Sequence, residues 1–300
     1  MKIQLENDTL KAEILSKGAE LKSLVTKEDG QEYLWEADPA FWGKTSPILF
    51  PFIGKLEGAA YLYNDRRYEM EKHGFARDMD FSVKEQEKDR VVFFIKSTEE
   101  TLRKYPFPFC LEVEYCLGEN GIEENVKVYN VGTETMYYSL GGHPAFACPL
   151  VMASGRVGSR RDSFIRLYGV EDQKEVEASV ISVPQGFITG ETYRVALENN
   201  TFPVTEHTFD QDAVVLASQG VTAVGIVDKN GKEYVHVETD CPVWGIWSMP
   251  DQAASYICIE PWWGICDSEG YKGTVQERPY TNTLKPGETK EHKIRITVGK

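Results

Sequence analysis

The stretch Cys241–Asp267 reads CPVWGIWSMPDQAASYICIEPWWGICD, and it decides which kind of fold the chain can form. Two apolar runs, Val243–Ser248 and Ser255–Gly264, flank a polar loop. Apolar runs of this length around a polar turn indicate two neighbouring β-strands. We therefore predict a β-hairpin with a long turn, and we expect the rest of the chain to be built around it.

One ionisable residue, Glu260, lies near the middle of the second run. Because side chains alternate along a strand, Glu260 shares a face with Tyr256 and Cys258, while Ile257 and Ile259 face the other way. A carboxylate in apolar surroundings is costly to bury unless it is paired, protonated or used in chemistry. Glu260 is therefore a candidate general base. The alternative is an edge glutamate that reaches solvent.

Turn signals recur along the whole chain and separate segments that read as strands. The turn dipeptides are Asp29-Gly30, Asn64-Asp65, Asn120-Gly121, Asn230-Gly231 and Pro286-Gly287. The strands between them are predicted at Arg90–Lys96, Leu111–Leu117, Val126–Val131, Met136–Leu140, Ala213–Leu216, Val221–Val227 and His292–Val298. In the last of these, Ile294, Ile296 and Val298 form an apolar face opposite a polar one.

Helical signals are few and short. Asp38-Pro39 is a candidate helix start, and Ser97 with Glu100 forms a capping-box pattern that Pro106 terminates. Long segments with helical periodicity are missing, which argues against a doubly wound α/β fold. The chain has no linker or repeat, so we predict a single domain over residues 1–300. Its predicted fold is all-β, a large antiparallel β-sandwich with few short helices.

Composition limits the partners. The 300 residues carry 33 Lys plus Arg against 47 Asp plus Glu, a net charge of −14. Nucleic acid and acidic membrane surfaces are therefore poor partners. The first residues lack a signal-peptide pattern and no apolar stretch is long enough to cross a bilayer, so we expect a cytoplasmic protein. In that setting the six cysteines, which form no CxxC pair, are expected to be buried free thiols.

Two histidines lie in segments suited to a cleft, His73 in KHGFARD and His143 in GGHPAF. Loop positions beside glycine can present a ring to a ligand. With Glu260 they lack the close ligand spacing of HxH or HExxH, so we predict no metal site. Nucleophile-elbow, P-loop and dinucleotide motifs are also missing. Acid–base chemistry by His and Glu without a cofactor remains.

Other polar residues are expected to be structural or exposed. His207, His236 and His292 lie in polar or alternating contexts and are predicted at the surface. The segment Arg156–Arg166 carries four arginines and is predicted to be a solvated loop.

The segments SPILFPFIGKL, HGFAR, YPFPF, SLGGHPAF, FDQDAVVL and IEPWWGICDS occur in an order that resembles the aldose 1-epimerase (galactose mutarotase) family, in particular its LacX-like branch. The resemblance runs nearly end to end. It implies a large antiparallel β-sandwich of the galactose mutarotase type. It also implies interconversion of the α and β anomers of a free aldose.

The resemblance assigns roles to particular residues. The family's general acid corresponds to His143, its general base to Glu260, and its ligand-positioning histidine to His73. Its sugar-binding aspartate corresponds to Asp210 or Asp212, of which Asp212 directly precedes a predicted strand.

Two further correspondences concern cations and tryptophans. The family's arginine ahead of the first histidine has no clean match, since Lys55 stands near its place and Arg77 can supply a guanidinium instead. Trp262, Trp263 or Trp35 can stack on the apolar face of a sugar.

The expected partner is thus a small sugar, bound by a monomer or homodimer without cofactor or metal. Three other functions stay open. A hexose-6-phosphate 1-epimerase would need clustered cations, for which Arg66, Arg67, Arg77 and the 156–166 loop are candidates. A sugar-binding protein would need no catalytic pair, and a glycosidase would need two carboxylates flanking the scissile bond.

Overall fold

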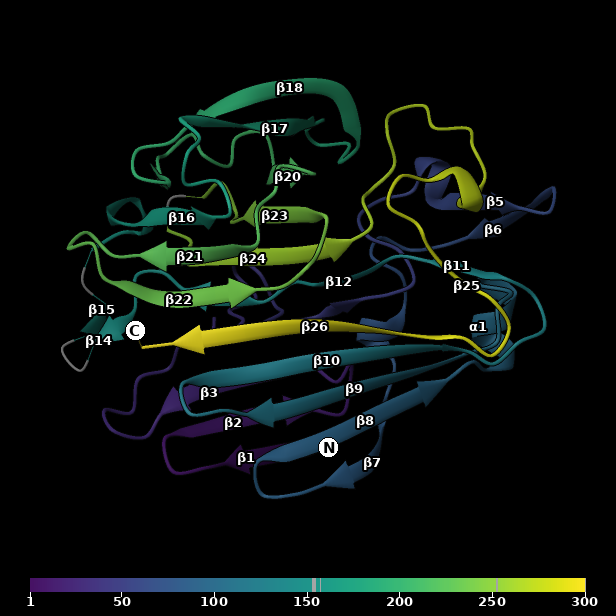
Figure 1. The fold of residues 1–300 in the computed structure, drawn as a ribbon, viewed down its shortest axis with the longest axis horizontal. Helices are drawn as coiled ribbons and strands as arrows, with labels where there is room; N and C mark the ends of the chain where they lie inside the picture. The colour runs from purple at the N-terminus through teal and green to yellow at the C-terminus, as the bar shows by residue number, and fades with distance from the viewer. Residues whose placement is uncertain (153–154, 157, 252, 300) are drawn as a thin grey trace.

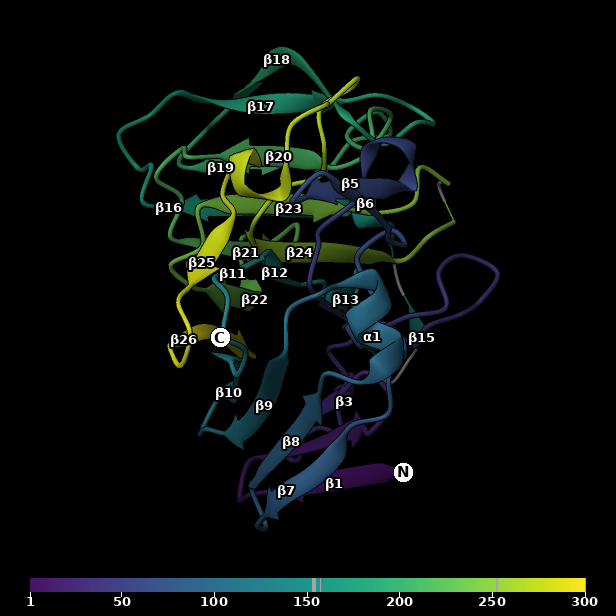
Figure 2. The same ribbon diagram turned by 90° about the vertical axis from the view of Figure 1, so that its right-hand side faces the viewer.

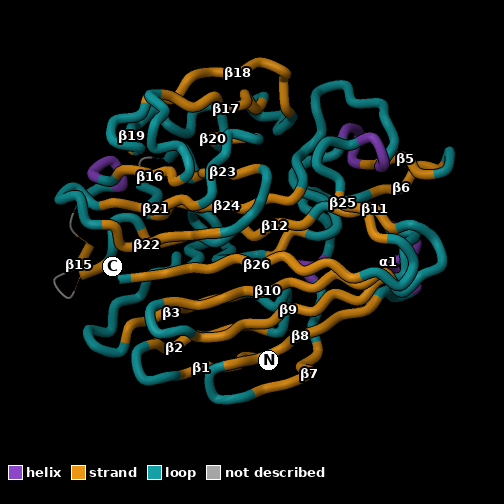
Figure 3. The backbone as a smooth tube through the Cα atoms, in the orientation of Figure 1, coloured by secondary structure: helices purple, strands orange, loops and turns teal. Residues whose placement is uncertain are grey.

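The structure is a computed structural model that describes residues 1–152, 155–156, 158–251 and 253–299 (Figure 1). Its regular structure is almost entirely strand, and the helical segments are short (Figure 3). Neighbouring strands within the sheets pair antiparallel, so the predicted all-β antiparallel fold is confirmed.

The larger sheet has nine strands and spans most of the view in Figure 1. In the order in which they pair, they are β19 (Thr201–Pro203), β16 (Phe164–Tyr168), β21 (Ala223–Val227), β22 (Glu233–Glu238), β26 (Thr289–Val298), β10 (Gly121–Asn130), β9 (Phe109–Leu117), β8 (Arg90–Lys96) and β7 (Ser82–Gln86).

The second sheet has eight strands and carries the Cys241–Asp267 stretch. In order they are β18 (Ile188–Ala196), β17 (Glu175–Ile181), β20 (Val214–Ala217), β23 (Val243–Trp247), β24 (Tyr256–Trp263), β12 (Leu140–Gly142) and β4 (Ile48–Leu49), with β13 (Ala145–Ala147) also paired to β24. Strands β23 and β24 pair antiparallel, which confirms the predicted hairpin.

Smaller sheets and short helices complete the described part of the chain. The strands are β1 (Lys2–Glu6), β2 (Leu10–Leu15) and β3 (Leu21–Thr26), β5 (Ala60–Tyr63) with β6 (Arg66–Glu69), β11 (Met136–Tyr138) with β25 (Asn282–Leu284), and β14 (Val151–Met152) with β15 (Gly155–Arg156). The helical segments are α1 (Glu99–Lys104) and the 3₁₀ turns Glu57–Ala59, Ala76–Asp78, Arg160–Asp162 and Val275–Glu277.

One large buried cluster joins the sheets. Ile257 and Ile259 of β24 belong to the same cluster as Ile294 and Ile296 of β26, so the two main sheets meet across it. The first strands enter this cluster too, and Figure 2 shows β1 and β3 beside β7, β8 and β9 at one end of the molecule. The alternation predicted for β26 is confirmed, since Ile294, Ile296 and Val298 are buried while Lys293 and Arg295 are exposed.

Most predicted strands are present with boundaries shifted by a few residues, and β8 spans the predicted residues. The strand predicted at Met136–Leu140 is instead divided between β11 and β12, which belong to different sheets. The capping box of α1 is formed by Thr98 and Thr101 rather than Ser97 and Glu100, one position further along. Asp38-Pro39 begins a turn and no helix, with the amides of Phe41 and Trp42 both bonded to the Asp38 carbonyl.

Of the three histidines predicted at the surface, His207 is exposed, whereas the His236 side chain is only 12% exposed and the prediction for His292 is wrong. His292 is 1% exposed, and its Nε2 lies 2.8 Å from the Tyr138 hydroxyl. On β26 it lies two residues before Ile294 and therefore on the buried face of the strand.

The surface prediction for Arg160 is also wrong, because the residue is buried. Its Nη1 donates to the Ser248 hydroxyl and to the carbonyl of Met249, which stabilises the turn after β23.

The six cysteines are free thiols, as expected, and all but Cys116 are buried. Of the helices in the described ranges, none is long and apolar enough to cross a bilayer.

Candidate active site

A cavity of about 310 Å³ lies beside β24, at the low end of the size range of small-molecule sites. Six of the residues predicted from sequence line it: His73, Arg77, His143, Asp212, Glu260 and Trp262. They come from segments that are widely separated in the chain, and the fold brings them to one place. The seventh predicted residue, Lys55, is not among the described residues that line this cavity.

The pairing register around β24 places His143 opposite Glu260. Strand β12 pairs Gly141 with Trp262, and β13 pairs Ala145 with Cys258. Both pairings share one register, so continuing either of them through the unpaired residues between them sets His143 across from Glu260. Directly opposite residues on neighbouring strands have their Cβ atoms within about 4.5–5.5 Å. The two side chains are therefore cross-strand neighbours on one face.

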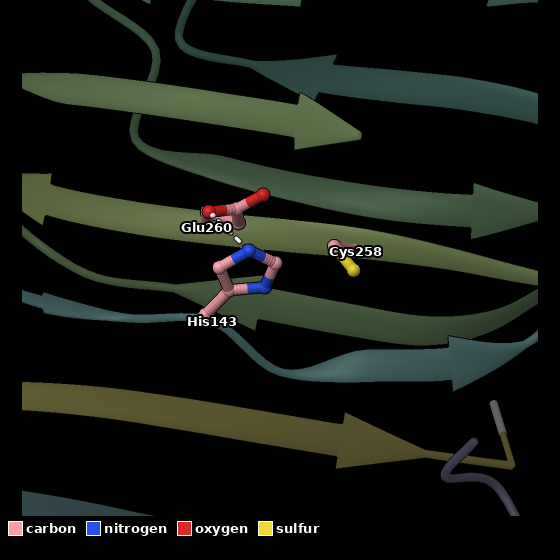
Figure 4. Close-up of side chains that lie close together, drawn as sticks. All are labelled: His143, Cys258 and Glu260. Carbon is pink, nitrogen blue, oxygen red and sulfur yellow. Dashed lines mark ion pairs between the residues drawn. The ribbon is translucent and has the colours of Figure 1, made fainter. Parts of the chain in front are cut away.

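His143 and Glu260 are in contact in the buried wall of the cavity. The Nε2 atom of His143 lies 3.1 Å from Oε2 of Glu260, and the residues are 7% and 2% exposed (Figure 4). Burial lowers the pKa of His143 to about 3 and raises the pKa of Glu260 well above its usual value. The alternative that Glu260 is an edge glutamate reaching solvent is wrong.

These shifts favour states in which the pair has no net charge. A contact of this kind needs one proton between Nε2 and Oε2, held by either atom. Protonated His143 with ionised Glu260, and neutral His143 with protonated Glu260, carry the same number of protons. Such a pair can give a proton to one oxygen of a ligand and take one from another.

His73 is held by Gly54 at two points. The backbone amide of Gly54 donates to Nδ1 of the ring at 3.0 Å, and the amide of His73 donates to the Gly54 carbonyl at 2.9 Å. Since Nδ1 accepts a hydrogen bond, the neutral ring carries its proton on Nε2. Burial lowers the pKa of His73 well below its usual value, so the ring is a neutral donor.

Glycines on both sides of β24 make room for the Trp262 indole. A Cβ atom on Gly141 of β12 would lie 2.8 Å from the indole, and one on Gly245 of β23 would lie 2.7 Å from it. Either separation is too short for a side chain. The indole therefore occupies the space over two neighbouring strands and forms part of the cavity wall.

Two aromatic residues of the cavity were missed by the sequence analysis. Trp42 stacks on the His143 ring with centroids 4.6 Å apart, and Trp247 meets the same ring edge-on at 6.0 Å. Trp42 follows the Asp38 turn, where no periodic pattern indicated a role. Trp247 lies on β23 within the quoted stretch, and its alternation with Gly245 and Val243 was the available signal.

The other proposed sugar-stacking tryptophans lie elsewhere. Trp35 is 1% exposed and packs in the buried cluster with Tyr256 and Cys258, and its Nε1 donates to the Trp42 carbonyl. Trp263 faces the main core on the opposite face of β24 from Trp262, and its Nε1 donates to Asp240.

The structure also separates the two aspartates. Asp212 lines the cavity just before β20, whereas Asp210 is exposed and pairs with His207 at 2.8 Å. The predicted preference for Asp212 therefore agrees with where the two residues lie.

Cations line the mouth of the cavity at Lys72 and Arg77. The Arg77 guanidinium donates to the Lys72 carbonyl at 2.8 Å, while the exposed Lys72 side chain was not predicted from sequence. Lys55 lies outside the cavity lining, with its ammonium 3.3 Å from the Pro184 carbonyl and its stem beside Gly186, which does line the cavity.

Three buried polar atoms of cavity-lining residues have no hydrogen-bond partner among the described residues. They are Nε of Arg77, Nδ1 of His143 and Nε1 of Trp262. Two of them face carboxylates. Arg77 Nε lies 3.5 Å from Asp78 Oδ2. The Trp262 side chain interacts with Glu260 and opposes the rise in its pKa that burial causes. Buried polar groups in native proteins are normally paired, so Nδ1 of His143 is the atom that indicates a polar ligand or ordered water.

Comparison with known proteins points to one family. A family model described as aldose 1-epimerase matches residues 1–297. The chromosomal protein LacX of Lactococcus lactis is 32% identical over 314 aligned positions, which cover 99% of each chain.

Solved structures agree. A galactose mutarotase related enzyme from Lactobacillus acidophilus is 31% identical, covers 100% of this chain and 98% of its own, and superposes with a TM-score of 0.89. A galactose mutarotase-like protein from Lactobacillus casei is 31% identical, covers 100% of both chains, and has a TM-score of 0.91.

Proposed function

The chain belongs to the aldose 1-epimerase family, and on that premise we propose that it is a mutarotase, which interconverts the α and β anomers of a free aldohexose. One observation carries the proposal. A buried histidine and a buried glutamate are in direct contact in the wall of a cavity that is large enough for a small ligand.

The chemistry needs an acid and a base at two oxygens bonded to the same carbon. Opening a pyranose places a proton on the ring oxygen, removes one from the anomeric hydroxyl, and breaks the bond between C1 and the ring oxygen. In the proposed mechanism His143 gives its Nε2 proton to the ring oxygen, and ionised Glu260 takes the hydroxyl proton. Rotation about C1–C2 and closure with the roles reversed give the other anomer.

The remaining cavity residues bind and orient the sugar. His73 offers its Nε2 proton, Asp212 offers a carboxylate, and Trp262 offers an apolar ring face. We further propose that no cofactor is needed, that residues 1–300 form one domain, and that the protein is a cytoplasmic monomer or homodimer without a nucleic-acid or membrane partner.

The mechanism predicts a bell-shaped dependence of kcat/KM on pH. Activity is lost when the pair gains a second proton and when it loses the only one. Because burial lowers the pKa of His143 to about 3 and raises that of Glu260, the two limbs move apart and the plateau broadens. Limbs at the ordinary values of the two groups would contradict the shared-proton state.

Polarimetry of freshly dissolved sugars tests the proposal. We expect the protein to accelerate the optical-rotation change of at least one of glucose and galactose over buffer alone. Glu260→Gln protein should not accelerate it, while Glu124→Gln, which alters a buried glutamate of β10 outside the cavity, should retain the activity. If the optical rotation changes at no more than the spontaneous rate for every sugar of a broad panel, the proposal is wrong.

One observation favours a second candidate, a hexose-6-phosphate 1-epimerase. Lys72 and Arg77 both line the cavity, and a phosphate group needs clustered cationic donors. Of the other candidates, Arg66 and Arg67 do not line the cavity among the described residues, and Arg160 is buried elsewhere. A Lys72→Ala change that raises KM for glucose 6-phosphate far more than for glucose would favour this candidate.

A further inference from the structure

A third potential ligand atom lies beside the acid–base pair. Cys258 is two residues before Glu260 on β24, so its side chain lies on the same face (Figure 4). Its register partner is Ala145, which makes Cys258 a diagonal neighbour of His143. One ring nitrogen of His143, the Cys258 sulfur and a Glu260 oxygen all lie within 4.8 Å of one another.

We propose that His143, Cys258 and Glu260 form a binding site for one Zn²⁺ ion, and that this ion inhibits the enzyme reversibly. The ion is not part of the proposed reaction, because it would occupy the groups that move the proton. Metal binding itself does not depend on the proposed function, whereas the inhibition rests on it.

The donor set is one that Zn²⁺ prefers. Imidazole, thiolate and carboxylate ligands bind zinc at about 2.0–2.3 Å, and three protein ligands leave a fourth position open. The His143 and Glu260 atoms are 3.1 Å apart, and all three ligand atoms lie within 4.8 Å of one another, so the side chains would have to close around the ion. The adjoining cavity supplies room for a water molecule at the fourth position.

Charge also balances. Thiolate and carboxylate together carry two negative charges and neutralise a divalent ion. On binding, the Cys258 proton and the single proton of the His143–Glu260 pair leave to solvent, since ligands must be deprotonated. Lys72, the cation whose charge acts on both members of the pair, opposes the ion and limits its affinity.

The simpler interpretation is that Cys258 is a packing residue of the small cluster that contains Trp35, Ala145 and Tyr256. Packing explains why Cys258 is buried. It does not explain why potential ligand atoms of His143 and Glu260 lie beside the sulfur. Cys266 provides a comparison, because it is a buried cysteine that lines the cavity, which Cys258 does not, and it does not belong to this group of three ligands.

Cobalt provides a spectroscopic test that does not depend on activity. Co²⁺ bound to a thiolate gives a charge-transfer band in the near ultraviolet, and four-coordinate Co²⁺ absorbs strongly in the visible. We expect metal-free, folded full-length protein to develop both features at one ion per chain, and excess Zn²⁺ to abolish them. Cys266→Ser should behave like the parent.

Cys258→Ser should lose the thiolate band and bind the ion more weakly. Loss of a residue that only hydrogen-bonds a metal ligand weakens binding by roughly 10–100-fold, and loss of the ligand itself should cost at least that much. Circular dichroism checks that this variant is folded, and Glu260→Gln, which weakens binding but keeps the thiol, provides a second variant. A band that persists in Cys258→Ser, or no band in the parent, would overturn the site.

Polarimetry then tests the inhibition. We expect Zn²⁺ to abolish mutarotation over the concentration range in which it displaces Co²⁺, and a chelator to restore it fully. Full activity with the site saturated would overturn the inhibitory role. If the parent shows no mutarotation at all, the proposed function fails while the cobalt titration still decides the site.

Discussion

The two faces of β24 carry similar residues in different surroundings. On one face, Glu260 and Trp262 line the cavity, and Glu260 contacts His143. On the other, Ile259 and Trp263 enter the main core, where Trp263 meets the ring of His292 edge-on with centroids 4.5 Å apart. A single strand therefore supplies the candidate active site and the centre of the sandwich, separated only by the alternation of its side chains.

His143 of the cavity and His292 of the core are alike in burial, in hydrogen bonding at Nδ1 and in pKa. Each is buried, each has an Nδ1 atom without a partner among the described residues, and burial lowers the pKa of each to about 3. They differ at Nε2, which faces a carboxyl group in His143 and the Tyr138 hydroxyl in His292. A lowered histidine pKa thus shows only that the ring is buried. The carboxyl partner and the adjoining cavity are what distinguish His143 as a candidate site residue.

The largest effect is expected on the cavity face. Glu260→Gln keeps the shape of the side chain and removes the base, so kcat should fall by at least about 100-fold, the lower range for a positioned proton-transfer group. His143→Asn should cost a similar factor, and the double variant should cost much less than the product because the two act as one unit. Stopped polarimetry on protein checked by circular dichroism measures this, and near-parental turnover of Glu260→Gln would refute the assignment.

The neighbouring residue on the core face should show the opposite pattern. Ile259→Ala removes buried methyl groups and should lower the free energy of unfolding by about 2–5 kcal/mol. Its activity per folded molecule should stay within a few-fold of the parent, because Ile259 faces away from the cavity. Urea unfolding followed by tryptophan fluorescence measures the stability. A hundredfold loss of kcat in folded Ile259→Ala would show that the two faces are not independent.

His292 should affect the pH dependence of stability and leave catalysis unchanged. Its pKa is about 3 in the folded protein and 6.5 in the unfolded chain, so between these values the unfolded state binds more protons and stability falls as the pH falls. His292→Gln should therefore reduce the loss between pH 7 and pH 5 by about 2 kcal/mol. Urea unfolding at both pH values tests this. If His292→Gln loses as much stability as the parent between pH 7 and pH 5, protonation of another group causes the loss.

The smallest effect is expected at Lys55. Its ammonium contacts the Pro184 carbonyl, and its stem lies beside Gly186, a residue that lines the cavity. We expect Lys55→Ala to raise KM a few-fold and to change kcat less, because it removes the support of the cavity wall at Gly186, which affects binding of substrate and transition state alike. Steady-state kinetics with Arg66→Ala as an exposed control tests this, and an unchanged KM would place Lys55 outside the site.

Local rules predicted whatever depends on alternation within one strand. The buried face of β26, the hairpin of β23 with β24, and the opposite orientations of Glu260 and Ile259 all follow from a period of two residues. Glu260 was singled out by the same alternation, since a lone carboxylate in an apolar strand demands an explanation, and the structure shows it buried in the cavity wall.

What sequence reasoning missed depends on register between distant strands. Cys258 was not recognised as a neighbour of His143, because that relation exists only once β13 is paired with β24. Trp42 lies after an irregular turn, and Lys72 precedes His73, whose positive φ of 67° no local pattern indicated. His292 was placed at the surface because its polar neighbours outweighed its position in the alternation.

The register that sets His143 opposite Glu260 has a consequence for how the protein forms. It joins segments that lie more than a hundred residues apart in the chain, so a long loop must close before the pair exists. Contacts of such separation form slowly and late in folding. A nascent chain that has not yet produced β24 therefore has no His143–Glu260 pair. Any ligand that binds only the finished cavity would stabilise the assembled sandwich as a whole, and its binding would report complete folding.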